Sequence, residues 1–365
     1  MHQASASPEA IPAALPGLLL PWYRANARDL PWRRTQDPYR IWVSEIMLQQ
    51  TRVAAVLGYY ARFLAALPSV ELLAAVSEER LMKLWEGLGY YSRARNLHKA
   101  ARIIVEQGGF PDTYEGLLAL PGIGDYTASA IASAAFGRRE AAVDGNVLRV
   151  AMRLTDCHDD ILDPRAKRRV RGQLQAIMPE EEADIRIFNQ AVMELGATVC
   201  GPGGPPRCEA CPVSSLCLAR RQGTAADLPV RAPLRQRRIE DRTVFILLRE
   251  GRVALRKRPS AGLLAGLWEF PSVEGTLDES AAGAAVAAWG LTPRTWKNKL
   301  AARHIFTHVE WHMTGYTLEV AGEGPRDFVW VSRSAMEDHA VPSAFARYSA
   351  EASEQLGEAD QTDIS

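Results

Sequence analysis

Residues 120–132 read LPGIGDYTASAIA, with Gly122 and Gly124 placed between two predicted helices. Pro121 ends the first helix, and the glycines permit a tight turn in which backbone N–H groups of the next helix point outward. Such a turn can bind an anion, for example a nucleic-acid phosphate, without a basic side chain. The structural alternative is a turn that only joins two core helices, and the surrounding sequence decides between the two.

The sequence around this turn is helical from residue 22 to residue 219. Apolar residues recur there at three and four positions, with breaks at Gly or Pro. One predicted helix begins near Asp37, which can cap it, with Pro38 at the first helical position. Further helices are predicted over residues 53–67, 78–88, 94–106, 113–120 and 126–136.

Length and composition indicate an ordinary globular protein of two or three domains. The chain has 365 residues, of which 47% are hydrophobic and 24% charged, and no apolar stretch approaches the length of a membrane span. Prolines interrupt the apolar patch near the N-terminus, and no basic start precedes it, so we expect a cytoplasmic protein. The 43 basic and 43 acidic residues balance, which neither favours nor excludes a nucleic-acid partner.

The pattern changes after residue 219. Residues 220–240 are rich in arginine (Arg220, Arg221, Arg231, Arg235, Arg237 and Arg238) and predict a solvated connector, or alternatively a basic linker that lies on DNA phosphates. Beyond it, two strands are predicted on either side of a turn at Glu250 and Gly251. A helix over 279–289 and strands over 313–320 and 328–331 complete an α/β domain.

Two carboxylates are candidates for catalysis. Glu45 shares a helical face with Ile41 and Gln49 and has apolar neighbours, so its pKa should be raised by burial. Asp144 follows a small apolar run and precedes a glycine, a position also typical of a helix cap. Two carboxyl groups in contrasting environments suit glycosidic bond cleavage, with one acid and one stabiliser of a sugar cation. The sequence spacing alone does not bring them together.

Four of the five cysteines are clustered. Cys200, Cys208, Cys211 and Cys217 are separated by seven, two and five residues, whereas Cys157 stands apart as an expected buried small residue. This clustering suggests a metal site more than disulfides. Four thiolates can hold either zinc or a cubane iron–sulfur cluster, and the chemistry does not choose between them.

An ordered set of motifs resembles one family. LPWRRTQDPYRIWVSEIMLQQTRV, LWEGLGYYSRARNLHKAA, LPGIGDYTASAI, VDGNVLRV, FNQAVMELGATVC and the four cysteines are similar, in order, to the MutY-type adenine DNA glycosylases. These belong to the helix-hairpin-helix superfamily, together with endonuclease III. The resemblance spans residues 22–217.

The resemblance implies a role for each matching residue. Glu45 would protonate N7 of the flipped adenine, Asp144 would stabilise the sugar cation, and Asn146 and Tyr126 would hold the carboxylates and the water. The adenine pocket would be lined by Arg28, Leu30, Trp32 and Gln190. Recognition of DNA and of 8-oxoguanine opposite the adenine would involve Gln50, Thr51, Leu88, Tyr90, Gly122 and Gly124. Because adenine stacked in a duplex cannot be reached, the base must be flipped out of the helix.

The resemblance also predicts the reaction outcome and the cofactor. Relatives of endonuclease III with lyase activity carry a nucleophilic lysine in the hairpin, where this chain has Tyr126. A monofunctional enzyme that leaves an abasic site is therefore expected. The family favours a [4Fe–4S] cluster on the four cysteines, with zinc as the alternative. In that family, six residues usually separate the first two cysteines. Here seven residues separate Cys200 from Cys208, and this glycine- and proline-rich loop can absorb the extra residue.

The C-terminal domain resembles a Nudix fold over residues 242–348, without the glutamate-rich helix that binds magnesium in Nudix hydrolases. Asp278 and Glu279 stand only at the start of the corresponding helix, so the expected role is binding. In the family, a short Phe-Ser-His loop of this domain helps recognise 8-oxoguanine. Phe306, Thr307 and His308 match it, with threonine in place of serine.

The predicted architecture is multidomain: an all-α helix-hairpin-helix glycosylase core with a four-cysteine iron–sulfur loop, followed by an α/β Nudix-like domain. The predicted parts are a flexible tail (1–21), a helical region (22–219, with a hairpin core at 32–141 and a cluster subdomain from 22–31 and 142–219), a basic linker (220–240), a Nudix-like domain (241–350) and a tail (351–365).

We expect a monomer that binds double-stranded DNA carrying adenine opposite 8-oxoguanine or guanine, acts on the bacterial nucleoid and has no membrane partner. The alternatives are a bifunctional endonuclease III-like lyase on oxidised pyrimidines, a DNA-binding module without catalysis, and a Nudix-type nucleotide hydrolase.

Overall fold

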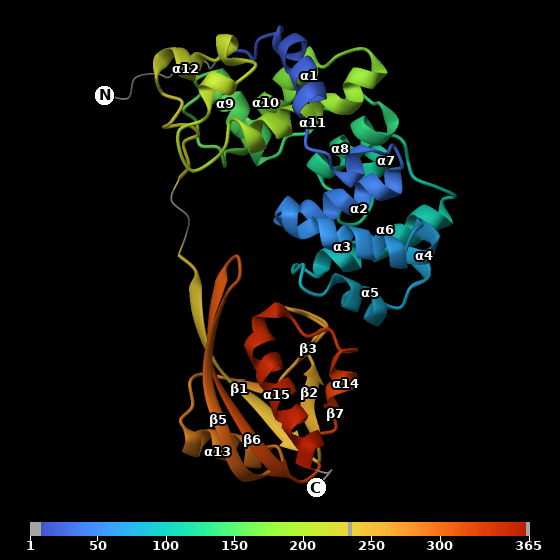
Figure 1. Cartoon of the computed structure of the whole chain (residues 1–365). Coiled ribbons are helices and arrows are strands. Elements are labelled where there is room, and N and C mark those ends of the chain that lie inside the picture. The colour runs from blue at the N-terminus through green and yellow to red at the C-terminus, as the bar shows by residue number, and fades with distance from the viewer. Residues whose placement is uncertain (1–8, 233–235, 363–365) are drawn as a thin grey trace. The chain divides into compact units, whose positions relative to one another are not determined.

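The computed structural model describes residues 9–232 and 236–362 (Figure 1). Its contacts divide the chain into two compact units. Unit 1 comprises Met1–Ala75 and Arg95–Pro233, and unit 2 comprises Val76–Ala94 and Leu234–Ser365. Arg235, one of the arginines of the predicted linker, lies outside the described residues.

The chain is helical up to residue 222, as predicted. The helices are α1 (Leu15–Asn26), α2 (Pro38–Leu48), α3 (Val53–Ala66), α4 (Val70–Ala75), α5 (Glu78–Trp85), α6 (Ser92–Glu106), α7 (Tyr114–Leu118), α8 (Asp125–Phe136), α9 (Gly145–Leu154), α10 (Pro164–Ile177), α11 (Glu182–Thr198) and α12 (Leu218–Gln222). Side-chain caps fix several of their starts. Asp37, for example, accepts a hydrogen bond from the Tyr39 backbone at 2.9 Å and is followed by Pro38.

The predicted N-terminal tail is wrong for residues 11–21. Helix α1 begins at Leu15, and Ile11, Leu15 and Leu19 are buried in a core that they share with α9, α10 and α11. The physical reason is the four-residue spacing of Leu15, Leu19 and Tyr23, which places them on one buried face of α1. We read the prolines as interruptions, but Pro16 occupies the first turn of this helix, where proline is common, and the helix continues through Pro21.

Part of the predicted solvated connector is also packed. Arg220 and Arg221 lie in α12, and Ala225 and Leu228 are buried against Ala219 in a small cluster that includes two of the cysteines. Two apolar side chains among the arginines are enough to hold this stretch on the protein surface.

Unit 2 contains a mixed β-sheet. Within the described residues its strands are β1 (Arg238–Arg249), β2 (Arg252–Lys257), β3 (Trp268–Glu269), β4 (Ser272–Glu274), β5 (Thr292–Ile305), β6 (Val309–Ala321) and β7 (Phe328–Val331). The strand order is β3-β2-β1-β6-β5, with β1 and β6 parallel, β4 paired with β1 and β7 with β2. The helices of this part are α13 (Glu279–Ala288), α14 (Arg333–Met336) and α15 (Ala346–Thr362).

Helices cover both faces of this sheet. Alternate side chains of β1 enter two different cores, since Val244 and Ile246 pack with α15 whereas Phe245 and Leu247 pack with α13. The predicted C-terminal tail from residue 351 is therefore wrong, because Ala352 and Leu356 of α15 are buried in the first of these cores. The α/β class predicted for this region is confirmed.

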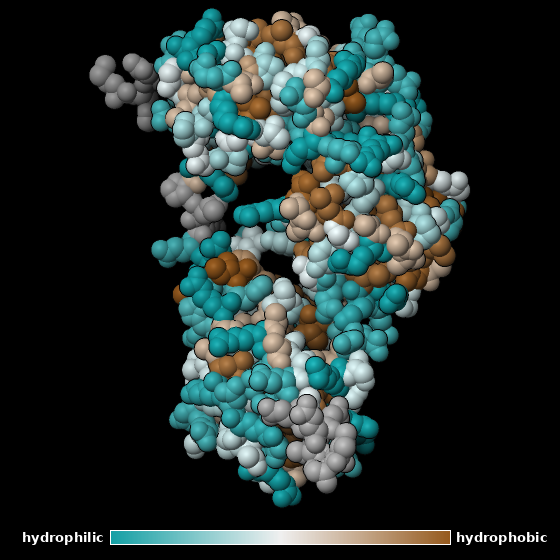
Figure 2. Space-filling model, in the orientation of Figure 1, coloured by the Kyte–Doolittle hydropathy of each residue, from teal (hydrophilic) through white to brown (hydrophobic). Residues whose placement is uncertain are grey.

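Strand β5 was not predicted from the sequence. It pairs antiparallel with β6 at the end of the strand order, and register shifts near Pro293 and Trp296 interrupt the pairing. Most of its side chains are exposed or half-buried, so it lacks the clear apolar alternation that reveals a strand. The face shown in Figure 2 mixes hydrophilic and hydrophobic residues. None of the described helices has both the length and the apolar character needed to cross a membrane.

Candidate active site

A pocket of about 550 Å³ lies within unit 1 and collects most of the predicted site residues. Its walls come from the 3-10 turn at Pro31–Arg33, from α2 and from the helices α8, α9 and α11. The predicted residues that line it are Arg28, Leu30, Trp32, Glu45, Gln50, Thr51, Tyr126, Asp144, Asn146 and Gln190. Segments up to about 160 residues apart in the sequence therefore meet around one cavity.

Glu45 is placed in the pocket by the apolar face of α2. Ile41 and Gln49, one turn away on either side, line the same cavity. The carboxyl atom Oε2 is buried and has no hydrogen-bond partner among the described residues. Burial raises the pKa of Glu45 to about 7, and nearby Asp144 also raises it, while a hydrogen bond from Tyr126 and the charge of Arg33 lower it. Near neutral pH this carboxyl can therefore donate a proton.

Asp144 has a different environment in the same pocket. It caps α9, and its Oδ1 accepts a hydrogen bond from the Val147 backbone at 2.7 Å, while Oδ2 accepts one from Asn146 Nδ2 at 2.8 Å. The cap interpretation and the catalytic interpretation are thus compatible, because the cap fixes the carboxylate at the pocket wall.

Tyr126 lies in the first turn of α8 and lines the same pocket as the two carboxylates. Its hydroxyl donates to Met193 Sδ at 3.5 Å and also interacts with Glu45. Burial and the two neighbouring carboxylates raise the pKa of Tyr126 well above its ordinary value, so it stays a neutral donor. This hydroxyl can orient a carboxyl group or a water molecule, but it cannot serve as an amine nucleophile.

Glu194 and Arg33 also line the pocket and were missed by the sequence reasoning. Glu194 is fully buried and accepts hydrogen bonds from Arg28 Nε and Nη2, both at 2.8 Å, and from Arg33 Nη2 at 2.7 Å. Burial alone would raise the pKa of Glu194, but these bonds outweigh it and hold the pKa at about 2. The available signal was the four-residue spacing from Gln190, which places both residues on one face of α11.

A chain of hydrogen bonds leads from the pocket to the first cysteine. Asn146 Oδ1 accepts from Arg149 Nη2 at 2.8 Å, and Arg149 Nε donates to the Cys200 carbonyl at 2.8 Å. Gly196 makes room for this path, because a Cβ there would lie 2.7 Å from the Asn146 Cβ. Asn146 is thus fixed at both ends of its amide.

The four clustered cysteines line one small pocket of unit 1. Arg153, itself buried, donates a hydrogen bond to Cys200 Sγ at 3.2 Å. Burial raises the pKa of Cys211 to about 11, and a bound cation would favour its thiolate form. Within the described residues, no three His, Cys, Asp or Glu side chains are grouped closely enough to hold a single metal ion. Cys157 is buried elsewhere in the unit.

The glycine-rich turn has the predicted form. Gly122 has φ +78°, and a Cβ there would lie 2.6 Å from the Asn96 Cβ, so a larger residue cannot replace it without displacement. Gly124 is the N-cap of α8, and nothing lies within 4 Å of the position where its Cβ would be. Asp125, the first residue of this helix, is paired with Arg171, which offsets its negative charge at a site expected to bind phosphate.

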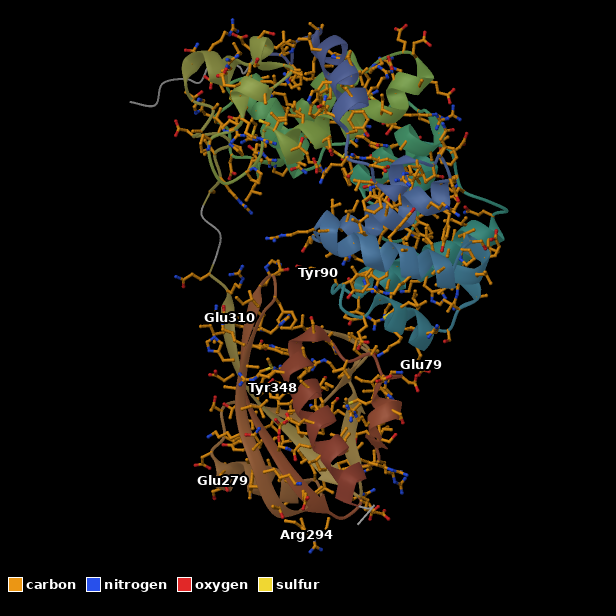
Figure 3. All side chains as sticks on the ribbon, viewed as in Figure 1. Glu79, Tyr90, Glu279, Arg294, Glu310 and Tyr348 are labelled. Atoms are coloured by element: carbon orange, nitrogen blue, oxygen red, sulfur yellow. The ribbon has the colours of Figure 1, made fainter. Side chains whose placement is uncertain are left out.

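The remaining predicted residues belong to unit 2. Leu88 and Tyr90 lie in the segment between α5 and α6, and Phe306, Thr307 and His308 form the turn between β5 and β6. The Tyr90 hydroxyl and Thr307 Oγ1 lie 3.1 Å apart. His308 is exposed in this turn, and its carbonyl accepts a hydrogen bond from the Arg238 backbone at 3.1 Å. Figure 3 labels Tyr90 among the side chains.

The helix that corresponds to the metal-binding helix of Nudix hydrolases has no row of carboxylates. Asp278 is its N-cap and accepts a hydrogen bond from the Ala281 backbone at 2.8 Å. Glu279 follows at the first helical position, and small apolar residues make up the rest. The buried Glu269 is paired with Arg256 and Arg258. Apart from Asp278 and Glu279 at its start, α13 therefore carries no carboxylate.

Two family models match the chain. Residues 43–179 match the HhH-GPD superfamily of base excision DNA repair proteins, and residues 243–351 match the NUDIX domain. The first match contains Glu45, Tyr126 and Asp144, and the second covers the strand-rich part of unit 2.

Curated relatives match most of the chain. The adenine DNA glycosylase of Homo sapiens is 36% identical over 402 residues, covering 92% of this chain and 73% of the relative. That of Schizosaccharomyces pombe is 30% identical and covers 87% and 85%, respectively. Among solved structures, a thermostable thymine-DNA glycosylase is 28% identical with a TM-score of 0.52, covering 57% of this chain and 96% of that one.

Proposed function

The chain belongs to the adenine DNA glycosylase family, and we propose that it removes adenine paired with 8-oxoguanine or guanine in double-stranded DNA. As a monofunctional glycosylase of base excision repair, it hydrolyses the N-glycosidic bond and leaves an abasic site. The single observation that carries the assignment is the pocket in which Glu45 and Asp144 meet in contrasting environments.

The chemistry follows from these two environments. Glu45, with a pKa of about 7, is protonated often enough at neutral pH to donate its proton to N7 of the flipped adenine, which makes the base a better leaving group. Asp144, fixed by its hydrogen bonds to Asn146 and to the α9 backbone, stabilises the positive charge that develops on the sugar. Water then completes the hydrolysis, oriented by Tyr126 and Asn146.

The base itself is held by the rest of the pocket. Leu30 and Trp32 offer apolar surface for a flipped purine, and Gln190 offers an amide for its polar edge. Arg28 and Glu194 form a rigid charged pair beside it. The absence of a lysine at position 126 removes the amine that a Schiff base with the sugar requires.

Recognition of the base opposite adenine is assigned to Gln50, Thr51, Leu88, Tyr90 and the turn at residues 306–308. Two observations support this. Gln50 has φ +59° at the pocket rim, a conformation that is uncommon outside glycine and typical of functional positions. Tyr90 is half-exposed, and its hydroxyl lies at hydrogen-bond distance from Thr307. The hairpin with Gly122 and Gly124 is proposed to bind the DNA backbone.

The four cysteines are proposed to hold a [4Fe–4S] cluster. All four line one pocket, where four thiolates could hold either a cubane or a zinc ion, and the family resemblance favours the cubane. Arg153 adds a positive charge beside Cys200, where the thiolates would accumulate negative charge. When bound, the cluster supplies a rigid anchor for residues 200–217, since adenine hydrolysis needs no redox step.

The test uses purified full-length protein and duplexes with A opposite 8-oxoguanine, G or T, treated with alkali after incubation. Strand breaks are expected for the first two duplexes and not for A opposite T, and Glu45→Gln should abolish them while duplex binding survives. Equal cleavage of all three duplexes, or of none, would contradict the proposal. Efficient borohydride trapping of the protein on DNA would contradict monofunctional chemistry, and broad visible absorbance separates iron–sulfur from zinc.

A further inference from the structure

The segment between α5 and α6 has an unusual backbone. Gly87, Gly89 and Tyr90 have φ values of +91°, +69° and +47°, so three of four consecutive residues adopt the left-handed region. Glycine tolerates this conformation, but tyrosine rarely adopts it without support from its surroundings. Something must hold residues 87–90, here called the reading loop, in this form.

Arg93 provides that support. Its side chain is 8% exposed, and its Nη2 donates to the carbonyls of Leu88 at 3.0 Å and Gly89 at 3.1 Å. Its backbone N–H donates to the Tyr90 carbonyl at 2.9 Å. One residue therefore makes hydrogen bonds to three successive carbonyls of the reading loop.

The guanidinium also contacts two aromatic rings. Its Cζ lies 5.4 Å from the centre of the Trp85 ring and 5.5 Å from the centre of the Tyr90 ring. Trp85 Nε1 donates to the same Gly89 carbonyl at 3.1 Å. Burial lowers the pKa of Arg93 to about 10, which still leaves the group charged at neutral pH. A planar cation that bonds to carbonyls at its edge and packs near rings is a role that lysine cannot fully replace.

We propose that Arg93 is a positioning residue that sets the selectivity for 8-oxoguanine over guanine opposite adenine, acting through Leu88 and Tyr90. The inference rests on the proposed function, in which those two side chains contact the opposite base. Without Arg93, the left-handed backbone at Tyr90 relaxes and the tyrosine hydroxyl leaves its place beside Thr307 Oγ1. The chemistry at Glu45 and Asp144 does not depend on this contact.

The experiment compares Arg93→Met and Arg93→Lys with Lys99→Met, a matched loss of charge at an exposed position on α6. Single-turnover rates and duplex affinities are measured for A opposite 8-oxoguanine and A opposite G. We expect Arg93→Met to reduce the preference for 8-oxoguanine about tenfold, the effect of losing one good charged hydrogen bond. Arg93→Lys should recover only part of the preference, and Lys99→Met should retain all of it.

Because a preference is a ratio measured on one protein, loss of folded molecules does not change it. If Arg93→Met is too unstable to purify, Arg93→Lys is compared in the wild-type and Tyr90→Ala backgrounds. The lysine variant should then lower the preference less in the Tyr90→Ala background, where only the contact through Leu88 remains, than in the wild-type background. An unchanged ratio in the Arg93 variants, or an equal effect in both backgrounds, overturns the inference. Absence of adenine release by the wild-type enzyme would instead contradict the proposed function.

Discussion

The pH dependence of adenine release should report the hydrogen bond between Tyr126 and Glu45. Because that bond favours the ionised carboxylate, it lowers the pKa of Glu45, and burial with the nearby Asp144 raises it to the net value of about 7. Tyr126→Phe removes the hydroxyl and keeps the ring, so the raising effects are then opposed only by the charge of Arg33. The pKa of Glu45 should therefore increase in this variant.

The size of the effect follows from the protonated fraction of Glu45. For an acid of pKa about 7, the rate should fall about tenfold between pH 6 and pH 8, as the protonated fraction drops from about 91% to about 9%. Loss of a hydrogen bond worth about 1.4 kcal/mol to the carboxylate raises the pKa by about one unit. The variant should then lose only about half its rate over the same interval.

The assay is single-turnover adenine release from a duplex with A opposite 8-oxoguanine, measured at half-unit steps from pH 5.5 to 9. Single-turnover conditions separate chemistry from product release. Tyr59→Phe, outside the pocket, serves as the control. A descending limb in Tyr126→Phe at the same pH as in the wild type, or at a lower one, would refute the assignment of Glu45 as the titrating acid.

Three further predictions concern stability and geometry. Glu45→Gln should increase the free energy of unfolding at pH 8 by at most about 3.4 kcal/mol, measured in urea titrations. The reason is that a carboxyl whose pKa is raised from 4.5 to about 7 destabilises the folded protein once it loses its proton above pH 7. A matching gain at pH 5 would argue against this cause. Glu194→Gln should cost about 3–5 kcal/mol at pH 7 in the same assay, since it leaves two cations without their buried partner. With its pKa near 2, Glu194 should keep stabilising the protein down to about pH 4.5 and lose that contribution at lower pH. Gly196→Ala should slow single-turnover adenine release at least tenfold by displacing Asn146. An unchanged rate with an intact thermal midpoint would contradict the role of Asn146 in holding the carboxylate and the water.

The helices that were predicted well are those with a local signal. Asp37 before Pro38 marks the start of α2, and the glycines at 122 and 124 mark the turn before α8. The elements that were missed depend on partners distant in sequence. Strand β5 exposes most of its side chains and is defined by its pairing with β6, and α1 and α15 were taken for tails although each buries an apolar stripe. Local composition near a chain end does not show whether a core lies beside it.

The candidate site likewise combines residues that have a local sequence signal with residues that depend on distant partners. The apolar neighbours of Glu45 on its predicted helix indicated that it is partly buried, but no local pattern indicates that Asp144 faces the same cavity. Family resemblance supplied that pairing. Glu194 was missed because its partners, Arg28 and Arg33, lie more than 160 residues earlier in the chain. A buried charge pair is visible only after folding has brought the two segments together.

The pocket thus contains three carboxyl groups, those of Glu45, Asp144 and Glu194, that behave differently. Their surroundings, and not their residue type, cause the difference. Glu45 is half-buried with apolar neighbours on α2 and retains its proton near neutral pH, whereas Glu194 is fully buried but is ionised by two arginines. Asp144 is fixed by an amide and by a helix N-terminus. Exchanging the environments would exchange the roles, because a proton donor needs a buried carboxyl without a neighbouring cation bound to it, and a cation stabiliser needs a fixed ionised one. Packing of α2, α9 and α11 around the cavity therefore determines which carboxyl group acts as the acid.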